Sequence, residues 1–223
     1  MSVFATLTTY MAATDSRDKM LKGAGCFFKM VGAINGNQNF LKTGTAMSDA
    51  RSAMRMLAWL GSIQKISDAM ERRIVQPRDV LLVLRSLFDC IFSLFDNIVF
   101  AGRFFDPTSL NLAHLSRISR ASLFYAYVVA VVTDVYDLVR DPNMPRRGDR
   151  CLVLTRNACD MVSSIGNVSS IDIGAANVAA LGLISSIIVT REQLTAAAAK
   201  SGGSAVGTAT AKTAAAAAPQ PKK

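Results

Sequence analysis

The sequence predicts an all-α protein, a membrane-embedded helical bundle with amphipathic helices and a C-terminal transmembrane helix. Three observations support this fold class. Of the 223 residues, 51% are hydrophobic and 18% are charged, below the quarter or so usual for soluble domains. Apolar residues recur at helical spacing from Met1 to Thr190, and no useful stretch alternates as a strand does. The stretch from Met161 to Thr190 contains one charged residue, Asp172.

The sequence divides into three regions. Residues 1–105 are predicted to form an N-terminal amphipathic helical region, and residues 106–192 a hydrophobic, membrane-embedded region. Residues 193–223 are rich in alanine and lysine with a Pro-Gln-Pro end, a composition that cannot bury a core, so we expect a disordered tail.

Helices of the first region begin and end at recognisable signals. A first helix carries apolar residues on one face, and the string Thr14-Asp15-Ser16-Arg17-Asp18-Lys19 is typical of a helix start. The second helix is expected to break at Gly32, followed by a connector over 32–45. Pro77 opens a later helix that continues to Phe105. In that helix we expect Arg85 to pair with Asp89, and Asp96 with Arg103.

A single basic amphipathic helix is predicted from Ser48 to Ile74. Apolar residues fall on one side of its helical wheel and charged residues mostly on the other, so it suits either a membrane surface or the outside of a bundle. Trp59 lies one turn from Arg55, as an interfacial anchor would. The predicted membrane-binding residues are Arg51, Arg55, Met56, Trp59, Leu60, Ile63, Lys65, Ile66, Met70, Arg72 and Ile74.

The hydrophobic region contains the candidate membrane spans. Residues 121–139 could span if Asp134 and Asp137 were tolerated, whereas residues 173–190 are uncharged throughout. Small residues in the second span would let another helix approach closely, so pairing in the bilayer is expected. The predicted transmembrane residues are Ile173, Gly174, Ala179, Gly182, Ser185 and Ile188.

Charge and motifs narrow the function. The formal net charge of +9 implies an acidic partner, either anionic membrane lipids or nucleic acid. Because the basic residues are interleaved with apolar runs and no nucleic-acid-binding signature occurs, we expect anionic lipids and no nucleic acid. The sequence has no P-loop, GxSxG, HExxH or metal-spaced cysteine and histidine cluster, so we expect no enzyme, catalytic residue, metal or cofactor.

Several strings, in order, resemble the peroxin-eleven family of peroxisomal membrane-elongation and proliferation peroxins. They are the start motif at 14–19, Ser48-Asp49-Ala50-Arg51 through Leu57, the segment 96–103, and the hydrophobic run 156–188. The residues that match the family's motifs are Thr14, Asp15, Arg17, Asp18, Lys19, Asp96 and Arg103. The kinetoplastid branch, whose organelles are glycosomes, is the branch we expect.

The resemblance implies an integral protein of the peroxisomal or glycosomal membrane with both termini facing the cytosol. Such a protein would elongate the membrane before fission and control organelle number and size. It would form homo-oligomers and act with fission machinery and other peroxins. A non-selective solute channel of the same membrane is the alternative that the family also permits. A soluble helical scaffold is disfavoured by the apolar stretch 161–190.

Overall fold

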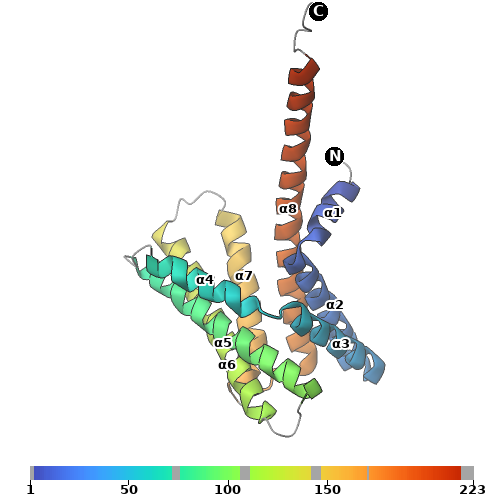
Figure 1. The fold of residues 1–223 in the computed structure, drawn as a ribbon. Coiled ribbons are helices and arrows are strands. Elements are labelled where there is room, and N and C mark those ends of the chain that lie inside the picture. Colours follow the sequence, from blue (N-terminus) through green and yellow to red (C-terminus); the bar gives the residue numbers. More distant parts are fainter. Residues whose placement is uncertain (1–2, 72–75, 106–110, 142–146, 170, 217–223) are drawn as a thin grey trace, which may run out of the picture.

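The structure is a computed structural model that describes residues 3–71, 76–105, 111–141, 147–169 and 171–216. The described residues form α-helices and one short 3₁₀ turn, without a strand (Figure 1). In chain order they are α1 (Val3–Ala12), α2 (Thr14–Asn35), α3 (Gln38–Met54), α4 (Ala58–Glu71), α5 (Pro77–Phe105), α6 (Leu112–Arg140), α7 (Arg147–Ser164), η1 (Ile165–Asn167) and α8 (Ala175–Ala216). The predicted all-α class is confirmed.

The connector between α2 and α3 is shorter than predicted. The helix continues past Gly32 to Asn35, and Gly36 ends it at a φ of 63°, a left-handed conformation that glycine adopts without steric cost. Asn37 then caps α3, its side chain accepting a hydrogen bond from the Asn39 backbone N–H at 3.0 Å. These adjacent stop and start signals make the turn two residues long instead of the predicted 32–45.

The predicted single helix from Ser48 to Ile74 is wrong, because two helices occupy this segment. The first, α3, ends at Met54, and α4 begins at Ala58. Between them Leu57 has a φ of 65°, which is unfavourable for a residue with a Cβ atom. The break therefore separates the basic residues Arg51 and Arg55 from the apolar residues of α4.

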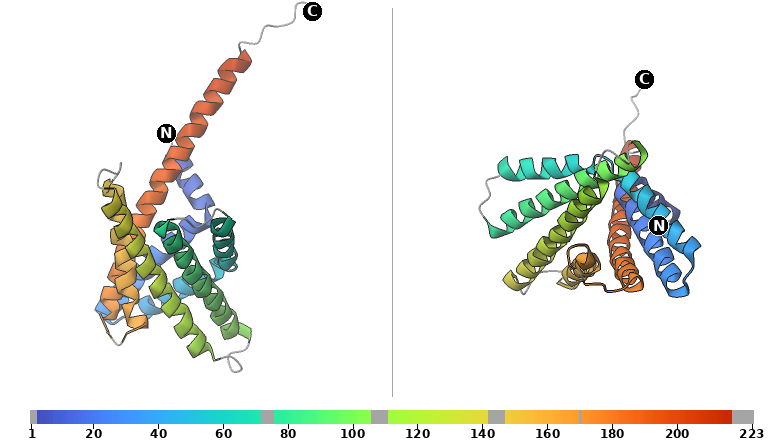
Figure 2. Two further views of the ribbon diagram at one scale, coloured as in Figure 1. Left: turned by 90° about the vertical axis from the view of Figure 1, so that its left-hand side faces the viewer. Right: turned by 90° about the horizontal axis from the view of Figure 1, so that it is seen from below.

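Six helices form a closed ring within the described part of the chain. The contacts run from α5 to α6, α7, α8, α2 and α3, and then back to α5. The view from below in Figure 2 shows the helices fanned out from α5 and α6 on one side, through α7 and α8, to α2 and α3 on the other. Helix α4 contacts α5 alone among the described helices, and α1 contacts α8 and α2. The first and last helices of the chain thus lie next to each other.

The interior of the bundle is unusually polar and its exterior unusually apolar. Fully buried side chains include those of Asn157, Ser185 and Ser186, whereas Phe4 and Ile34 are 81% and 68% exposed. A soluble bundle shows the reverse distribution, because water drives large apolar side chains inward. This distribution suits a bundle surrounded by lipid.

Among the described residues, two helices are long and apolar enough to span a membrane. They are α6 and the part of α8 from Ala175 to Ala199, with mean hydropathies of 1.5 and 1.2. In the most apolar stretch of each helix only 28% of the residues are buried inside the protein. Neither helix is therefore the buried core helix of a soluble protein. A candidate span near the C-terminus agrees with the sequence-based expectation.

Helix α8 differs from the prediction at both ends. Ile173 and Gly174 precede the helix, and Gly174 has a φ of 81°. At the other end α8 continues to Ala216 and projects beyond the other helices (Figure 1). Alanine has the highest helix propensity, which explains a helix in the first part of the predicted tail. The three-region division at residues 105 and 192 stays a prediction.

Candidate functional site

A charged cluster joins α2, α3 and α5. The Asp18 carboxylate on α2 accepts hydrogen bonds from Nε and Nη2 of Arg51, at 3.1 and 3.3 Å. Arg55, which follows α3, lies 3.7 Å from the same carboxylate and donates to Asp96 on α5 at 3.3 Å. Its guanidinium also lies 5.3 Å from the centre of the Phe92 ring. One arginine therefore contacts three groups on two other helices.

Asp18 is the centre of this cluster, since only 3% of it is exposed. Burial by itself raises the pKa of a carboxyl, but the positive charges of Arg51, Lys19 and Arg55 together outweigh burial and hold the pKa of Asp18 below its ordinary value. The carboxylate is therefore held in its charged form by its neighbours.

A second buried group joins α2, α7 and α8. The Lys22 ammonium lies 2.6 and 2.8 Å from the two carboxylate oxygens of Asp160 on α7. It also donates to the hydroxyl of Ser185 on α8 at 3.0 Å. Burial lowers the pKa of Lys22, and the adjacent Asp160 carboxylate opposes this effect. Each of the three ammonium protons thus has an acceptor in the protein.

The remaining contacts of the ring are also bridged by polar side chains. Between α5 and α6, Arg78 donates to Asp137 at 2.7 Å. Between α6 and α7, Asn157 donates to Asp134 at 2.6 Å, and between α7 and α8 Arg156 donates to Glu192 at 2.8 Å. We call these bridges, with the two clusters above, the polar ring. Every helix contact of the closed ring contains one of them.

Residues of the predicted family motifs lie in or beside the polar ring. Asp18 and Asp96 belong to it, but Asp96 pairs with Arg55 and Arg103 pairs with Asp49 at 3.3 Å, so the predicted pairing of Asp96 with Arg103 is wrong. Asp96 and Arg103 are two turns apart on one helix, whereas Asp49 on α3 and Arg55 just after it lie next to α5.

The rest of the motif lies in the first turns of α2. Asp15 lies 3.6 Å from Lys19 and accepts a hydrogen bond from Gln193 on α8. Arg17 donates to the Thr14 hydroxyl at 3.2 Å. The first turns of α2 therefore form contacts within the helix and also with α8.

Two predicted membrane-binding residues, Arg51 and Arg55, belong to the polar ring and are not on the apolar face of α4. Leu60, Ile63 and Met70 are exposed, with 49%, 47% and 68% of their surface accessible. Four others are placed as follows: Met56 is exposed in the break before α4, Trp59 and Ile66 are half-buried, and Lys65 is exposed. Arg72 and Ile74 lie outside the described residues.

The small residues of the predicted transmembrane face pack within the chain. Ala179 is buried, and a Cβ atom on Gly182 would lie 2.7 Å from Sγ of Cys26 on α2. A Cβ on Gly23 would likewise lie 3.3 Å from Cβ of Ser186, so α2 and α8 approach closely through small residues from both sides. The expected pairing is thus satisfied by α2. Ile188 is half-buried.

Sequence reasoning missed the partners Lys22, Arg78, Asn157 and Asp160 as functional residues. A signal for them existed, because an isolated charge in an apolar helix needs a partner wherever lipid replaces water. The identity of each partner depends on which helices are neighbours, and the sequence does not contain that information directly.

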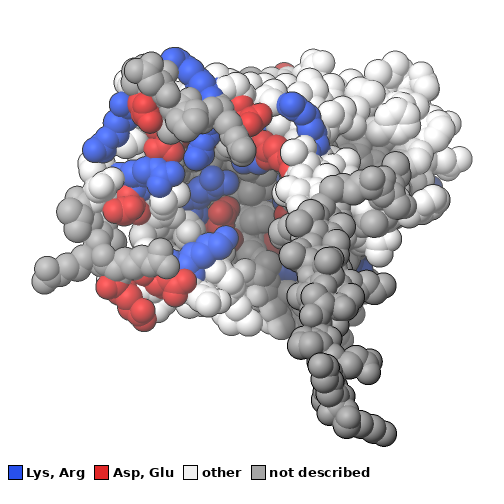
Figure 3. Space-filling view, turned by 90° about the horizontal axis from the view of Figure 1, so that it is seen from above, with Lys and Arg blue, Asp and Glu red and all other residues white. Residues whose placement is uncertain are grey.

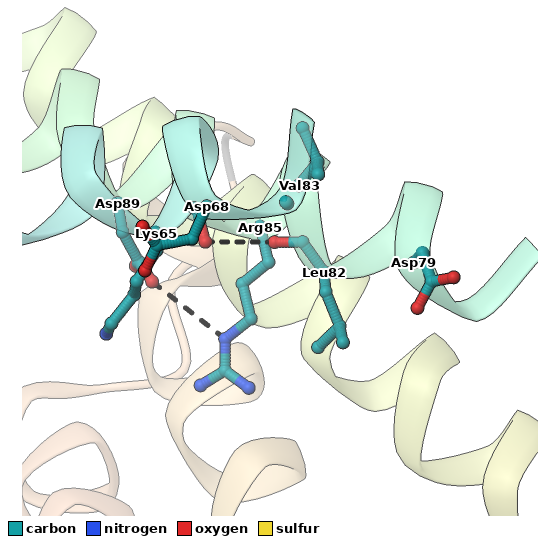
Figure 4. Close-up of a pocket in the computed structure, with 9 residues that line it drawn as sticks. Lys65, Asp68, Asp79, Leu82, Val83, Arg85 and Asp89 are labelled. Atoms are coloured by element: carbon teal, nitrogen blue, oxygen red, sulfur yellow. Dashed lines mark hydrogen bonds and ion pairs between the residues drawn. The ribbon is translucent and has the colours of Figure 1, made fainter. Parts of the chain in front are cut away.

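A cleft of about 660 Å³ lies between α4 and α5. Figure 4 shows Lys65 and Asp68 extending into it from α4, and Arg85 and Asp89 from α5. Arg85 lies 3.9 Å from Asp89, which confirms that predicted pair. Figure 3 shows that charged side chains gather on the half of the upper face that α4 to α6 occupy, while the other half is largely uncharged. The described residues contain no group of side chains suited to a metal ion.

A model of the family Peroxisomal biogenesis factor 11 (PEX11) matches residues 4–150. The chain belongs to this family. The match runs from α1 to the start of α7 and so includes the Asp18, Arg51, Arg55 and Asp96 cluster. No curated protein and no solved structure matches the chain. PEX11 is a family of peroxisome biogenesis factors, not an enzyme family, and its members act at the peroxisomal membrane.

Proposed function

We propose that this PEX11 protein remodels and elongates its organelle's membrane, promoting proliferation and fission and so controlling organelle number and size. The observation that supports the proposal is the exposed apolar face of α4, formed by Leu60, Ile63 and Met70. This helix contacts only α5 among the described helices, so its opposite side is open to a lipid leaflet.

The physical route is insertion of α4 into one leaflet. Burying a large apolar side chain contributes about 1.5–3 kcal/mol, so three of them hold the helix at the interface. The exposed ammonium of Lys65 adds about 1 kcal/mol near an anionic surface. A helix that enters only one leaflet expands that leaflet relative to the other, and the membrane bends toward the side without it.

The test compares two variants of the full chain that add the same charge to α4. Ile63→Glu places a carboxylate on the apolar face, and Gln64→Glu, the control, places one at the adjacent exposed position. Both are reconstituted with anionic liposomes, and tubules are counted by electron microscopy. We expect Ile63→Glu to abolish tubulation and Gln64→Glu to retain it. Equal tubulation by both variants would refute the proposal.

The organelle, the membrane topology and the partners of the protein are also proposed. We infer a glycosomal membrane, integral insertion with both termini in the cytosol, homo-oligomers, and contact with fission machinery and other peroxins. Because the small face of α8 is occupied by α2, an oligomer would use another surface. Protease treatment of intact organelles tests the topology, since tags at both ends should be removed while the lumenal matrix stays protected.

A solute channel remains a second candidate because the polar ring surrounds the interior of the bundle. The charges of the ring pair with one another, however, and a conducting path needs groups that are free to coordinate a solute. Conductance in planar bilayers that is lost on Asp96→Asn would favour the channel. Tubulation without conductance would favour remodelling.

A further inference from the structure

The cleft between α4 and α5 is lined by charges of both signs. Its residues are Lys65, Asp68, Ala69, Asp79, Leu82, Val83, Arg85, Ser86 and Asp89. Asp79 lies apart from the others in Figure 4 and accepts a hydrogen bond from the Gln76 backbone N–H at 3.3 Å, so it serves the start of α5. Two cations and two carboxylates are left to face the cleft.

These four side chains are only loosely engaged with the protein. Within the described residues Lys65 and Asp68 form no ion pair, and Arg85 and Asp89 approach each other only to 3.9 Å. The pKa of Asp89 is raised by burial, against the nearby positive charges of Arg85 and Lys65, so the protein does not fully compensate its charge. A ligand that carries both charges would complete the pairing.

We propose that this cleft binds the zwitterionic headgroup of an aminophospholipid, of the phosphatidylethanolamine type. Lys65 and Arg85 contact the phosphate, and Asp68 and Asp89 accept hydrogen bonds from the primary ammonium. The proposal rests on the membrane contact inferred above but not on membrane bending.

The chemistry of the lining favours ethanolamine over the other common headgroups. A choline group has no N–H to donate and is recognised by aromatic faces, and the lining residues, all described, include no aromatic ring. A glycerol headgroup has no cation for the two aspartates. A serine headgroup adds a carboxylate that these aspartates would repel.

A membrane lipid suits the cleft better than a soluble zwitterion of the same chemistry. Leu82 lines the cleft and is 37% exposed, and α4, which forms the other wall, carries the exposed apolar side chains of Ile63 and Met70. In this arrangement the headgroup occupies the cleft and the acyl chains contact the exposed apolar side chains of the two helices.

The experiment measures which lipid stays bound to the purified full chain. The protein is equilibrated in detergent micelles containing equal amounts of dioleoyl-phosphatidylethanolamine and dioleoyl-phosphatidylcholine, and bound lipid is counted by native mass spectrometry. We expect enrichment of the ethanolamine lipid by about tenfold, the ratio that corresponds to one charge-assisted hydrogen bond. Equal retention of the two lipids would overturn the proposal.

Matched variants assign the preference to the cleft. Asp68→Asn with Asp89→Asn should bring the ratio close to one, whereas Asp141→Asn with Asp149→Asn, at exposed carboxylates outside the cleft, should leave it unchanged. Lys65→Gln, at an exposed position where folding is not at risk, should weaken the binding of both lipids and leave the ratio of bound ethanolamine lipid to bound choline lipid unchanged. A cleft variant that folds and retains the wild-type ratio would refute the assignment.

Further measurements in the same experiment distinguish the ethanolamine lipid from other lipids and from a soluble headgroup. Phosphatidylserine or phosphatidylglycerol retained as strongly as the ethanolamine lipid would refute headgroup recognition. Free phosphoethanolamine that displaces the lipid at equal concentration would show that the site takes a soluble zwitterion instead. Because Ile63→Glu should leave the lipid ratio unchanged, failure of membrane remodelling and failure of headgroup binding are distinguishable.

Discussion

The ammonium nitrogen of Lys22 lies 2.6 Å from Oδ1 of Asp160, and this ion pair joins α2 to α7 across 138 residues of sequence. The side chains are only 15% and 10% exposed. Asp160→Ala should lower the free energy of unfolding by about 3–5 kcal/mol, because it leaves a buried ammonium without its counter-charge. Unfolding in detergent micelles, followed by circular dichroism, measures the loss.

The control for that prediction is the exposed pair of Arg103 and Asp49, whose side chains are 52% and 47% exposed. Asp49→Ala should cost at most about 1 kcal/mol, since water screens this pair. The double variant Lys22→Met with Asp160→Leu should recover most of the stability lost by Asp160→Ala. If Asp160→Ala and Asp49→Ala lowered the free energy of unfolding equally, burial of the Lys22–Asp160 pair would not explain its contribution.

Asp18 should make the protein sensitive to acid. Its pKa in the folded state is depressed, so it stabilises the fold fully above the ordinary carboxyl pKa and loses that contribution as the pH falls through the folded value. Stability should therefore decline below about pH 4, the ordinary range of an aspartate. Asp18→Asn should be less stable at neutral pH and show a flatter acid limb. Asp141→Asn, at an exposed position, should keep the wild-type profile.

Gly182 should not tolerate a side chain, because an added Cβ would meet Cys26 Sγ at 2.7 Å. Gly182→Ala should cost about 1–3 kcal/mol through overpacking. Gly61→Ala is the matched control, since that glycine in α4 has nothing within 4 Å of the new Cβ, and it should gain about 0.5–1 kcal/mol. Cys26→Ala should rescue Gly182→Ala, and the absence of rescue would count against this contact.

Replacing Leu57 by glycine should not lower the stability of the protein. Its φ of 65° costs a residue with a Cβ about 1–2 kcal/mol, and its side chain is 60% exposed, so little packing is lost. Leu57→Gly should raise the melting temperature or leave it unchanged. Leu60→Gly, inside α4 at a similarly exposed position, should lower the melting temperature, because glycine in a helix costs about 1 kcal/mol of stability. A lower melting temperature for Leu57→Gly would contradict the positive φ.

Local signals predicted much of the fold. Pro77 opens α5 and the polar string at Thr14 opens α2, because proline geometry and polar start residues act within one helical turn. The break after α3 has no such signal, since it contains neither proline nor glycine. Arg55 there is held by Asp18, Asp96 and Phe92, which come from two other helices. Contacts between distant parts of the chain override the local pattern at this point.

The same distinction applies to the candidate site. Periodicity predicted that Leu60, Ile63 and Met70 share one face of a helix, and the structure places all three on the exposed side of α4. Composition also predicted that α8 would pair through small residues. It could not predict that the partner would be α2 of the same chain, because Gly23 and Cys26 become neighbours of α8 only when the ring closes.

The position of α8 between α2 and α7 determines when the protein can finish assembling. A ribosome makes α2 well before α8, so Lys22 and Gly23 remain without their neighbours on α8 until that helix has been synthesised. A chain that stops before residue 175 would leave Lys22 without the Ser185 hydroxyl and would expose the surface of α2 at Gly23 that α8 covers. The ring of helices therefore cannot close until α8 has been made, however early the other helices fold.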